Sequence, residues 1–520
     1  MGFSGISNGH DTQPGVLSRQ SARLFGSPTG NAGNPLRIEW LVMNRNRYSH
    51  AVSYWLALFT VILTLASVAT AEWKEKVLYS FQGGADNGSV PAGGVVFDKQ
   101  GNLYGVTSDG GGVYQLAPPA QQGGAWTETV LYVFKGNTQG DGATPAGGLA
   151  IDVAGNLYGT TAYGGTGNCV LLGILVGCGT VYELSPPAQK GGAWTETVLY
   201  SFPTAKQGYF PSGDLVFDST GNLYGATIFG GGHGTTCNGF YQYCGAIFEL
   251  SPPKIKGGKW KENVLYGFKG VAPGAQFGDG ANPNGGLVLD SKGAIYGTTY
   301  FGGNNVKGEC QGGVGGTGCG IVFKLAPPSQ NGGQWTKKVL HQFNGQDGSN
   351  SSAGVVFDAK GNLFGTTSFG PGPYGLVFEL KKPSGSLHSW AETVLHAFGN
   401  GNDGENPMAG LVLDASGRLY GTALGGGTHR GVVFRLNAPK RGNSWQLTVL
   451  YNLMGSPDGD HPTSGLIFDS KGNLYSPTQW GGRGSRVKGA AAPFLRSRRR
   501  ERTLIASRST REFGAQGEKK

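Results

Sequence analysis

Short apolar runs alternate with turn-forming residues along most of the chain. In one copy of this pattern, Leu149–Asp152 is an apolar run, and Leu157–Thr161 is a second run rich in aromatic and β-branched residues. Val153–Asn156 separates the two runs with residues that tolerate a positive φ. This arrangement predicts a β-hairpin.

Two further strands are expected downstream of this hairpin. They are Gly179–Leu184 and Trp194–Phe202, and a Pro-containing segment that begins at Ser185 divides them. The unit therefore has four antiparallel strands, which we call a, b, c and d in chain order.

The four-stranded unit recurs along the chain. Its b strand carries a GNLYG-like signature, which begins at Gly101, Gly155, Gly221, Gly293, Gly361, Gly417 and Gly472. Its d strand begins at a tryptophan, at Trp73, Trp126, Trp194, Trp260, Trp335, Trp390 and Trp445. The spacing runs from 53 residues (Trp73 to Trp126) to 75 residues (Trp260 to Trp335). Such a repeat is typical of a β-propeller, and seven copies predict seven blades.

The two ends of the repeat array are incomplete in complementary ways. The first d strand, Trp73–Phe81, precedes the first a strand, whereas the last a and b strands, near Leu466–Asp469 and Asn473–Tyr475, have no d strand after them. Pairing these ends would remove exposed sheet edges. We therefore predict an all-β, seven-bladed propeller of four-stranded antiparallel blades, whose last blade is closed by the N-terminal strand. No c strand is recognisable for that blade.

Composition separates the propeller from the N-terminal region. Residues 1–42 show no strand or helix period and are interpreted as an upstream extension without a structural role. Residues 43–71 contain a basic start, the uncharged apolar run Ala51–Val68 and a closing Ala69-Thr-Ala71, which is typical of a secretory signal peptide. An uncleaved membrane anchor is the alternative, because the run of about eighteen residues is long enough to span a bilayer. The propeller is expected at 72–482.

The cysteines agree with export. All six lie in local pairs within b-to-c connections, and these pairs are Cys169 with Cys178, Cys237 with Cys244, and Cys310 with Cys319. Local pairs in an exported chain predict disulfides, which would staple the inserted loops of the longer repeats. Buried free thiols or a metal site are the alternatives.

The formal net charge of +10 does not describe the propeller. Residues 1–50 contribute +3 and residues 481–520 contribute +9, which leaves −2 for the remainder. A nearly neutral body gives no support to a nucleic-acid surface. The basic end, 483–520, with its run Arg496–Arg502, is interpreted as a disordered tail arising from a frame error or a C-terminal replacement, and a polyanion-binding arm is the alternative.

The repeated residues also carry a resemblance to a known family. The combination of GNLYGTT, GTVYELSPP, WTETVLYSF and a DGxxPxGGL connection resembles the GloVer-type tandem repeat of exported bacterial proteins, over about Trp73 to Gly482. The resemblance implies location and architecture, and it implies no catalytic residue. The Arg-rich end departs from the surface-anchoring tails that such proteins often have.

Antiparallel geometry places the d-to-a and b-to-c connections on one face, which we call the loop face. The Asp-Gly segments and the Cys-containing insertions fall on this face, as functional loops on a rigid scaffold do. Aromatic residues also end most b strands there, and they are candidates for stacking on sugar rings or apolar ligands: Tyr163, Phe229, Phe301, Phe369 and Trp480. Packing between blades as core is the alternative for these residues.

Metal and catalytic chemistry are weakly indicated. An aspartate begins each a-to-b turn, at Asp98, Asp152, Asp218, Asp290, Asp358, Asp414 and Asp469. These carboxylates are expected to accept backbone N–H bonds in their own turns, and calcium binding is the alternative. His233, His429 and His461 fall on the loop face without a matching carboxylate pattern, so no catalytic residue, metal or cofactor is assigned.

The sequence thus predicts an exported propeller that acts as a binding or interaction module, with polysaccharide as the first ligand class. A metal-dependent lyase or lactonase-like enzyme and a structural cell-surface protein are the alternatives. Expected partners are carbohydrate or a surface protein and no nucleic acid, with membrane contact only through an uncleaved signal. We expect a monomer that is secreted, either extracellular or in the cell envelope, with the periplasm as an alternative.

Overall fold

A computed structural model describes residues 73–83, 88–121, 123–136, 140–231, 244–255, 257–271, 277–304, 310, 318–330, 332–385, 388–399, 401–427, 430–439, 444–482 and, for the backbone, 493–499. All of them belong to the unit Thr70–Lys520, and the other unit, Met1–Ala69, lies outside the described residues. The predicted extension 1–42 and signal peptide 43–71 therefore lie outside them as well. No helix in the described part of the chain is long and apolar enough to cross a membrane.

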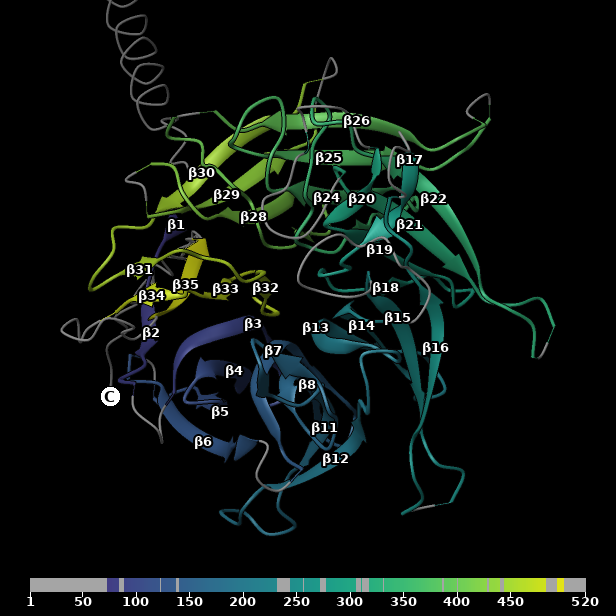
Figure 1. Ribbon diagram of the computed structural model, residues 1–520. Helices are drawn as coiled ribbons and strands as arrows, with labels where there is room; N and C mark the ends of the chain where they lie inside the picture. Colours follow the sequence, from purple (N-terminus) through teal and green to yellow (C-terminus); the bar gives the residue numbers. More distant parts are fainter. Residues whose placement is uncertain are drawn as a thin grey trace, which may run out of the picture. The chain divides into compact units, whose positions relative to one another are not determined.

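Six four-stranded antiparallel sheets follow one another along the chain (Figure 1). Blade 1 contains β3 (Ser89–Phe97), β4 (Leu103–Asp109), β5 (Gly112–Ala117) and β6 (Thr127–Val133). Blade 2 contains β7 (Gly142–Ile151), β8 (Leu157–Gly164), β11 (Thr180–Ser185) and β12 (Thr195–Ser201). Blade 3 contains β13 (Tyr209–Phe217), β14 (Leu223–Phe229), β15 (Ala246–Ser251) and β16 (Lys261–Gly267).

The next three blades have shorter a strands. Blade 4 contains β18 (Val288–Leu289), β19 (Ile295–Thr299), β21 (Ile321–Ala326) and β22 (Thr336–Gln342). Blade 5 contains β23 (Val356–Phe357), β24 (Leu363–Thr367), β25 (Leu376–Lys381) and β26 (Ala391–Ala397). Blade 6 contains β27 (Val412–Leu413), β28 (Leu419–Ala423), β29 (Val432–Asn437) and β30 (Gln446–Asn452). The predicted a, b, c, d order and the propeller class are confirmed in these six blades.

The remaining large sheet, which we call the terminal sheet, differs from the prediction. It has five strands, namely β32 (Ile467–Phe468), β33 (Leu474–Pro477), β35 (Pro493–Arg499), β1 (Trp73–Lys74) and β2 (Val77–Ser80). β35 pairs with β33 on one side and with both β1 and β2 on the other. β35 lies inside the segment that was predicted as a disordered tail, so that prediction is wrong for residues 493–499. A strand forms there because its backbone pairs with β33, as the backbone of a c strand pairs with the b strand in the six blades. The rest of that tail lies outside the described residues.

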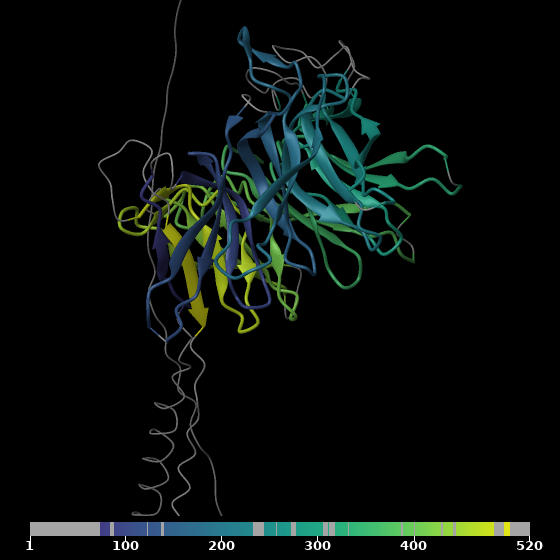
Figure 2. The same cartoon turned by 90° about the horizontal axis from the view of Figure 1, so that it is seen from below.

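Three two-stranded pairs join connections on the loop face. They are β9 (Val170–Leu171) with β10 (Ile174–Leu175), β17 (Phe277–Ala281) with β20 (Phe301–Asn304), and β31 (Gly459–Asp460) with β34 (Trp480–Gly481). The second and third pairs each bring a d-to-a connection beside the end of a b strand. In these two pairs the connection and the strand end therefore lie side by side, as predicted. Figure 2 shows the same sheets from below.

A glycine-aromatic contact explains the repeated b-strand signature. The b strands are buried along their length, and their central glycine lies against an aromatic ring of the c strand. A Cβ added at Gly225 would overlap the ring of Phe248, and one added at Gly297 would overlap that of Phe323. Glycine is therefore required where the c-strand aromatic crosses the b strand.

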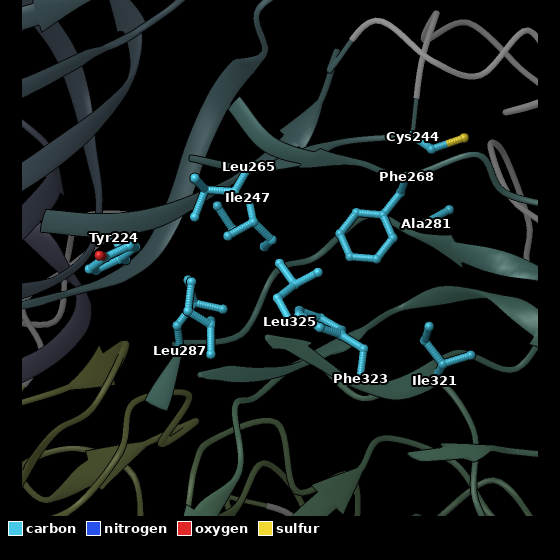
Figure 3. Close-up of a cluster of buried hydrophobic side chains, with 12 residues drawn as sticks. Tyr224, Cys244, Ile247, Leu265, Phe268, Ala281, Leu287, Ile321, Phe323 and Leu325 are labelled. Atoms are coloured by element: carbon cyan, nitrogen blue, oxygen red, sulfur yellow. The ribbon is translucent and has the colours of Figure 1, made fainter. Parts of the chain in front are cut away.

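The apolar core lies between adjacent sheets. One cluster contains Ile247 and Phe268 of blade 3 and its connection, together with Ile321, Phe323 and Leu325 of blade 4 (Figure 3). Phe268 meets Phe323 edge-on, with ring centroids 5.2 Å apart. Similar clusters join each neighbouring pair of blades, and two further clusters join the terminal sheet to blade 6 and to blade 1.

The d-strand tryptophans reinforce these junctions. Each described contact joins a tryptophan to the b-strand aromatic of the preceding blade, as Trp194 does with Tyr104 at 5.9 Å and Trp445 with Phe364 at 6.0 Å. Such aromatic pairs add to the burial of apolar area. The repeated tryptophan is thus an inter-blade residue.

The cysteine predictions agree with the described residues. Cys169 is bonded to Cys178, and Cys310 to Cys319. Cys244 is also disulfide-bonded, while its predicted partner, Cys237, lies outside the described residues. Disulfides persist in oxidising compartments, so the bonded cysteines are typical of a protein in an oxidising extracellular environment.

Candidate functional site

The aspartates of the a-to-b turns are engaged in their own turns. Asp152 accepts hydrogen bonds through Oδ1 from the backbone N–H groups of Ala154 and Asn156, each at 2.9 Å. Its Oδ2 accepts from the Asn156 side chain at 2.9 Å. The two backbone bonds to Oδ1 recur at the other turns, and such bonds lower the pKa of Asp218 and Asp469 despite partial burial. The carboxylates therefore have structural partners.

The five predicted aromatic residues do not form one continuous surface. Tyr163 and Phe229 are joined through Phe210, which lies 5.1 Å from the first ring and 5.9 Å from the second. Phe301 contacts Tyr300 and packs against the core cluster between blades 3 and 4. Phe369 and Trp480 are the exposed members, with 38% and 44% of their surface accessible. Of the predicted set, Phe301 thus packs on the core, Tyr163 and Phe229 are half-buried, and Phe369 and Trp480 are exposed.

Trp480 belongs to a polar group at one end of the loop face, which we call the Trp480 cluster. Its ring lies 4.4 Å from the imidazole of His461. His461 Nδ1 contacts the carboxylate of Asp460, which also accepts a hydrogen bond from Arg430 at 2.6 Å. Asp460 is buried, whereas Arg430 is largely exposed. The buried carboxylate therefore orients both a cationic and an imidazole side chain beside an exposed indole.

His461 also has an unusual backbone. Its φ is 54°, in the left-handed region, and the equivalent residue of every other repeat has a positive φ too. Three of these residues are asparagines, which tolerate the region, and the remainder are Val90, Thr144 and Phe210. Backbone strain at His461 is retained because its N–H donates to the carbonyl of Arg430 at 2.9 Å.

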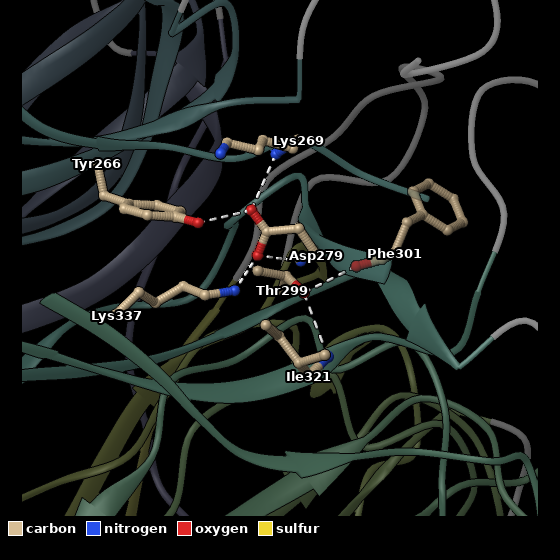
Figure 4. A network of polar contacts seen from close by, with 8 residues as sticks. Tyr266, Lys269, Asp279, Thr299, Phe301, Ile321 and Lys337 are labelled. Carbon is tan, nitrogen blue, oxygen red and sulfur yellow. Dashed lines mark hydrogen bonds and ion pairs between the residues drawn. The ribbon is translucent and has the colours of Figure 1, made fainter. Parts of the chain in front are cut away.

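A second symmetry-breaking group lies between blades 3 and 4 (Figure 4). Lys337 forms an ion pair with Asp279, and both side chains are almost buried. Asp279 also accepts hydrogen bonds from the hydroxyl of Tyr266 at 2.8 Å and from the N–H of Lys269 at 3.1 Å. Glutamate occupies the place of Lys337 in most other repeats, so this junction alone replaces an acid with a base.

The glutamates at that place are held in an unfavourable environment. Burial, with the negative charge of Asp141, raises the pKa of Glu196 to about 7. Burial also raises the pKa of Glu75 and that of Glu392 to about 7. In each of these three side chains, Oε1 is buried and has no hydrogen-bond partner among the described residues. The protonated form of these carboxyls is therefore favoured below about pH 7.

The described histidines do not form a cluster that could bind a metal ion. His341 lies 3.2 Å from Asp347 and His396 lies 3.0 Å from Asp403, in place of the tyrosine that contacts this aspartate in other repeats. His233 and His429 lie outside the described residues. Among the residues that the structure does describe, no group of three or more His, Cys, Asp or Glu could hold a metal ion.

The a strands surround a central cavity of about 480 Å³. Glycines recur in its lining beside larger apolar residues, and neighbouring a strands approach so closely that a Cβ at Gly93 would overlap the backbone of Gly147. One carboxylate, that of Asp214, enters this cavity and accepts a hydrogen bond from the N–H of Gly148 at 2.5 Å. The Asp214 side chain is exposed to this cavity, while desolvation by the enclosing walls raises its pKa and the bond from Gly148 opposes the effect.

Three overlapping stretches, 62–309, 173–391 and 310–492, match the Gloeobacter/Verrucomicrobia repeat. The chain belongs to the Gloeobacter/Verrucomicrobia repeat family. The resemblance seen in the repeated motifs is thereby confirmed. No curated protein matches this member of the family.

Solved structures similar to this Gloeobacter/Verrucomicrobia repeat protein include a catalytically inactive virginiamycin B lyase from Staphylococcus aureus with quinupristin, at 13% identity and a TM-score of 0.45, which covers 82% of this chain and 99% of that one. Hydrazine synthase from Kuenenia stuttgartiensis is similar at 15% identity and a TM-score of 0.43, covering 74% and 92%. A putative 6-phosphogluconolactonase from Bacteroides uniformis matches at 14% and 0.41, covering 70% and 84%. Similarities at this level carry no argument about activity.

The sequence analysis of this Gloeobacter/Verrucomicrobia repeat protein did not single out the polar residues that differ from the residue at the same position of the other copies. Asp214 stands where other copies have glycine, and Lys337 stands where most have glutamate. Asp460 and Arg430 became visible only through their contacts with His461. A comparison of the seven copies position by position would have found the first two.

Proposed function

We propose that this protein is an exported seven-bladed propeller that binds polysaccharide on its loop face. Export is supported by the disulfides and by the signal-like segment 43–71. The observation that carries the binding proposal is the Trp480 cluster, in which an exposed indole lies beside oriented polar groups.

The terminal sheet supports a seventh blade. β35 lies beside β33 as a c strand does, and β1 and β2 pair along the free edge of β35 in the place of a d strand. Trp126 of blade 1 contacts Tyr475 of the terminal sheet, and Trp73 contacts Tyr420 of blade 6. These are the same contacts that join consecutive blades elsewhere. Closure by the N-terminal strand is therefore part of the proposal.

Carbohydrate suits the Trp480 cluster for a chemical reason. The flat apolar face of a pyranose stacks on an exposed aromatic ring, and its hydroxyls need donors and acceptors held in fixed directions. Asp460 supplies the fixed anchor, Arg430 the donors and His461 a ring whose position is set from both sides. The exposed ring of Phe369 provides a second stacking surface on the same face.

The experiment is a glycan array probed with the disulfide-bonded protein, comparing wild type with Trp480→Ala, Phe369→Ala and Trp480→Phe. We expect wild type and Trp480→Phe to bind the same glycans and Trp480→Ala to lose at least tenfold in affinity. The Tm should stay unchanged within a few degrees because 44% of the Trp480 surface is exposed. His461→Asn keeps the left-handed backbone, since asparagine occupies this position in three other repeats, and it should weaken binding because the imidazole beside Trp480 is lost.

Three outcomes count against the proposal. Equal binding by wild type and Trp480→Ala would show that the cluster is not the site. Failure of the wild type on every glycan would instead favour the structural cell-surface alternative. Stoichiometric zinc or calcium in the purified protein would favour the metal-dependent enzyme alternative.

A further inference from the structure

Asp214 is the exception in a ring of glycines around the central cavity. Its position is the second residue of the paired small residues in each a strand, and the equivalents are Gly94, Gly148, Gly286, Gly354, Gly410 and Gly465. Six copies of the repeat therefore have no side chain at this place in the cavity wall, and one copy has a carboxylate. This single charged group makes one side of the cavity wall negative, whereas the equivalent places in the other repeats are uncharged.

The carboxylate is only half satisfied. Oδ1 accepts the hydrogen bond from Gly148 at 2.5 Å, while Oδ2 has no hydrogen-bond partner among the described residues. The cavity lining contains no lysine, arginine or histidine in the part of the chain that the structure describes. Asp214 is exposed to the cavity and no cationic side chain in the described lining neutralises it, so its charge is available to a cation that enters this space.

The size and lining of the cavity favour an organic cation over a metal ion. Calcium takes six to eight oxygen ligands and magnesium six in a tight octahedron, whereas one free carboxylate oxygen faces this space. The volume of about 480 Å³ falls in the range of small-molecule pockets. Val288, Val412 and Ile467 line the cavity and are partly exposed, so they offer apolar contacts to the carbon atoms of a ligand.

Two polar side chains near Asp214 in the cavity lining could orient a bound ligand. Ser212 donates a hydrogen bond to Oδ1 of Asn284 at 3.1 Å, which joins blades 3 and 4 at the cavity wall. Asn284 also lines the cavity, and its side chain carries an amide N–H group that can donate to a ligand. A ligand that carries both an ammonium group and a hydroxyl or carbonyl oxygen would be matched by this pair of neighbours.

We propose that the central cavity binds a small organic cation, whose ammonium group pairs with Asp214 while its carbon skeleton contacts the apolar wall. This site is separate from the Trp480 cluster and does not depend on the proposed binding of polysaccharide. A purely structural role, in which Asp214 only ties blade 3 to Gly148 of blade 2, is the competing explanation.

Calorimetric titration of the disulfide-bonded protein with choline, 1,4-diaminobutane and glucosamine tests the proposal. The neutral isostere 3,3-dimethylbutan-1-ol is the control ligand for choline. We expect one-to-one binding of at least one cation, no binding of the neutral isostere at the same concentration, and a loss of at least tenfold in Asp214→Asn. Asparagine keeps the oxygen that accepts from Gly148, so the Tm of this variant should match that of wild type.

Two further variants separate binding from stability. Asp214→Gly restores the residue of the other repeats and should also lose binding. Gly410→Asp, introduced into Asp214→Asn, should recover part of the affinity, because a Cβ at Gly410 meets open space. The proposal is overturned if none of the three cations binds wild type, or if wild type and Asp214→Asn bind equally. Trp480→Ala should leave cation binding unchanged, which distinguishes this site from the polysaccharide site.

Discussion

Trp126 lies edge-on against Tyr475, with ring centroids 6.4 Å apart, although the two residues come from opposite ends of the repeat array. Trp126 is buried, and the same cluster contains Leu78 and Phe81 from the N-terminal segment. The first described residues, the first blade and the last b strand thus share one core. This junction repeats the packing found between consecutive blades.

We predict that Trp126→Ala destabilises the protein as strongly as removal of a tryptophan within the array. The loss should be about 3–5 kcal/mol, because a large buried aromatic is deleted. Denaturant unfolding of Trp126→Ala and of the matched variant Trp194→Ala measures both. A much smaller loss for Trp126→Ala would indicate that the terminal sheet does not pack against blade 1 in solution.

We predict that stability falls as the pH rises from about 4.5 to about 7. The carboxyls of Glu75, Glu196 and Glu392 have a folded-state pKa of about 7, above the unfolded value of 4.5, so the folded state binds more protons in this window. Their contribution is fully present below pH 4.5 and is lost as the pH passes 7. Tm values at pH 5 and pH 8 measure the effect.

The same pH series needs a control variant. Glu196→Gln removes one of the titrating groups and should flatten the dependence, with its largest gain at pH 8. At more acidic pH the trend should reverse, because the pKa values of Asp218, Asp290 and Asp414 are lowered in the folded state. A Tm that rises steadily from pH 5 to pH 8 would contradict this account.

We predict that Thr144→Asn stabilises the protein by about 1 kcal/mol. Thr144 has a φ of 57° and a β-branched side chain, a combination that is strained. Asparagine tolerates this φ, and at the equivalent place Asn282 donates to the carbonyl of Ile228 at 3.0 Å. Urea unfolding measures the gain, and Asn282→Thr should show the opposite change. A loss of stability in Thr144→Asn would show that the strain is relieved in another way.

We predict that Lys337→Met destabilises the protein by about 3 kcal/mol, because it leaves the carboxylate of Asp279 buried without its counter-charge. Adding Asp279→Asn should recover most of this loss, since the uncompensated charge is then gone. Thermal unfolding of both single variants and the double variant forms the required cycle. Additive losses would contradict the ion-pair explanation.

The regular part of the fold was predictable because its cause is local. The b, c and d strands follow from alternating apolar residues, from the glycine that makes room for a c-strand aromatic, and from the tryptophan at each junction. Strand β35 was missed because it lacks the GVVF-like residues of the c strands in the six blades, and its position follows from backbone pairing with β33. No pattern within the segment itself indicates this partner.

The candidate sites were less predictable, because they depend on residues that meet across blades. The positions of Tyr163 and Phe229 follow from the repeat, but their link through Phe210 requires the strained turn of the next blade. The place of Trp480 was expected, whereas its neighbour Arg430 comes from a different connection. Whether the aromatic residues bind a ligand stays a prediction.

The contact between Gly93 and Gly147 limits how copies of the repeat can diverge. A side chain at either position would have to displace the backbone of the adjoining copy. Loops can lengthen and surface residues can drift after a duplication, but these inner residues must stay small in the copies that meet so closely. Each new copy that keeps these glycines therefore also keeps the close spacing of the a strands, and with it the width of the central cavity.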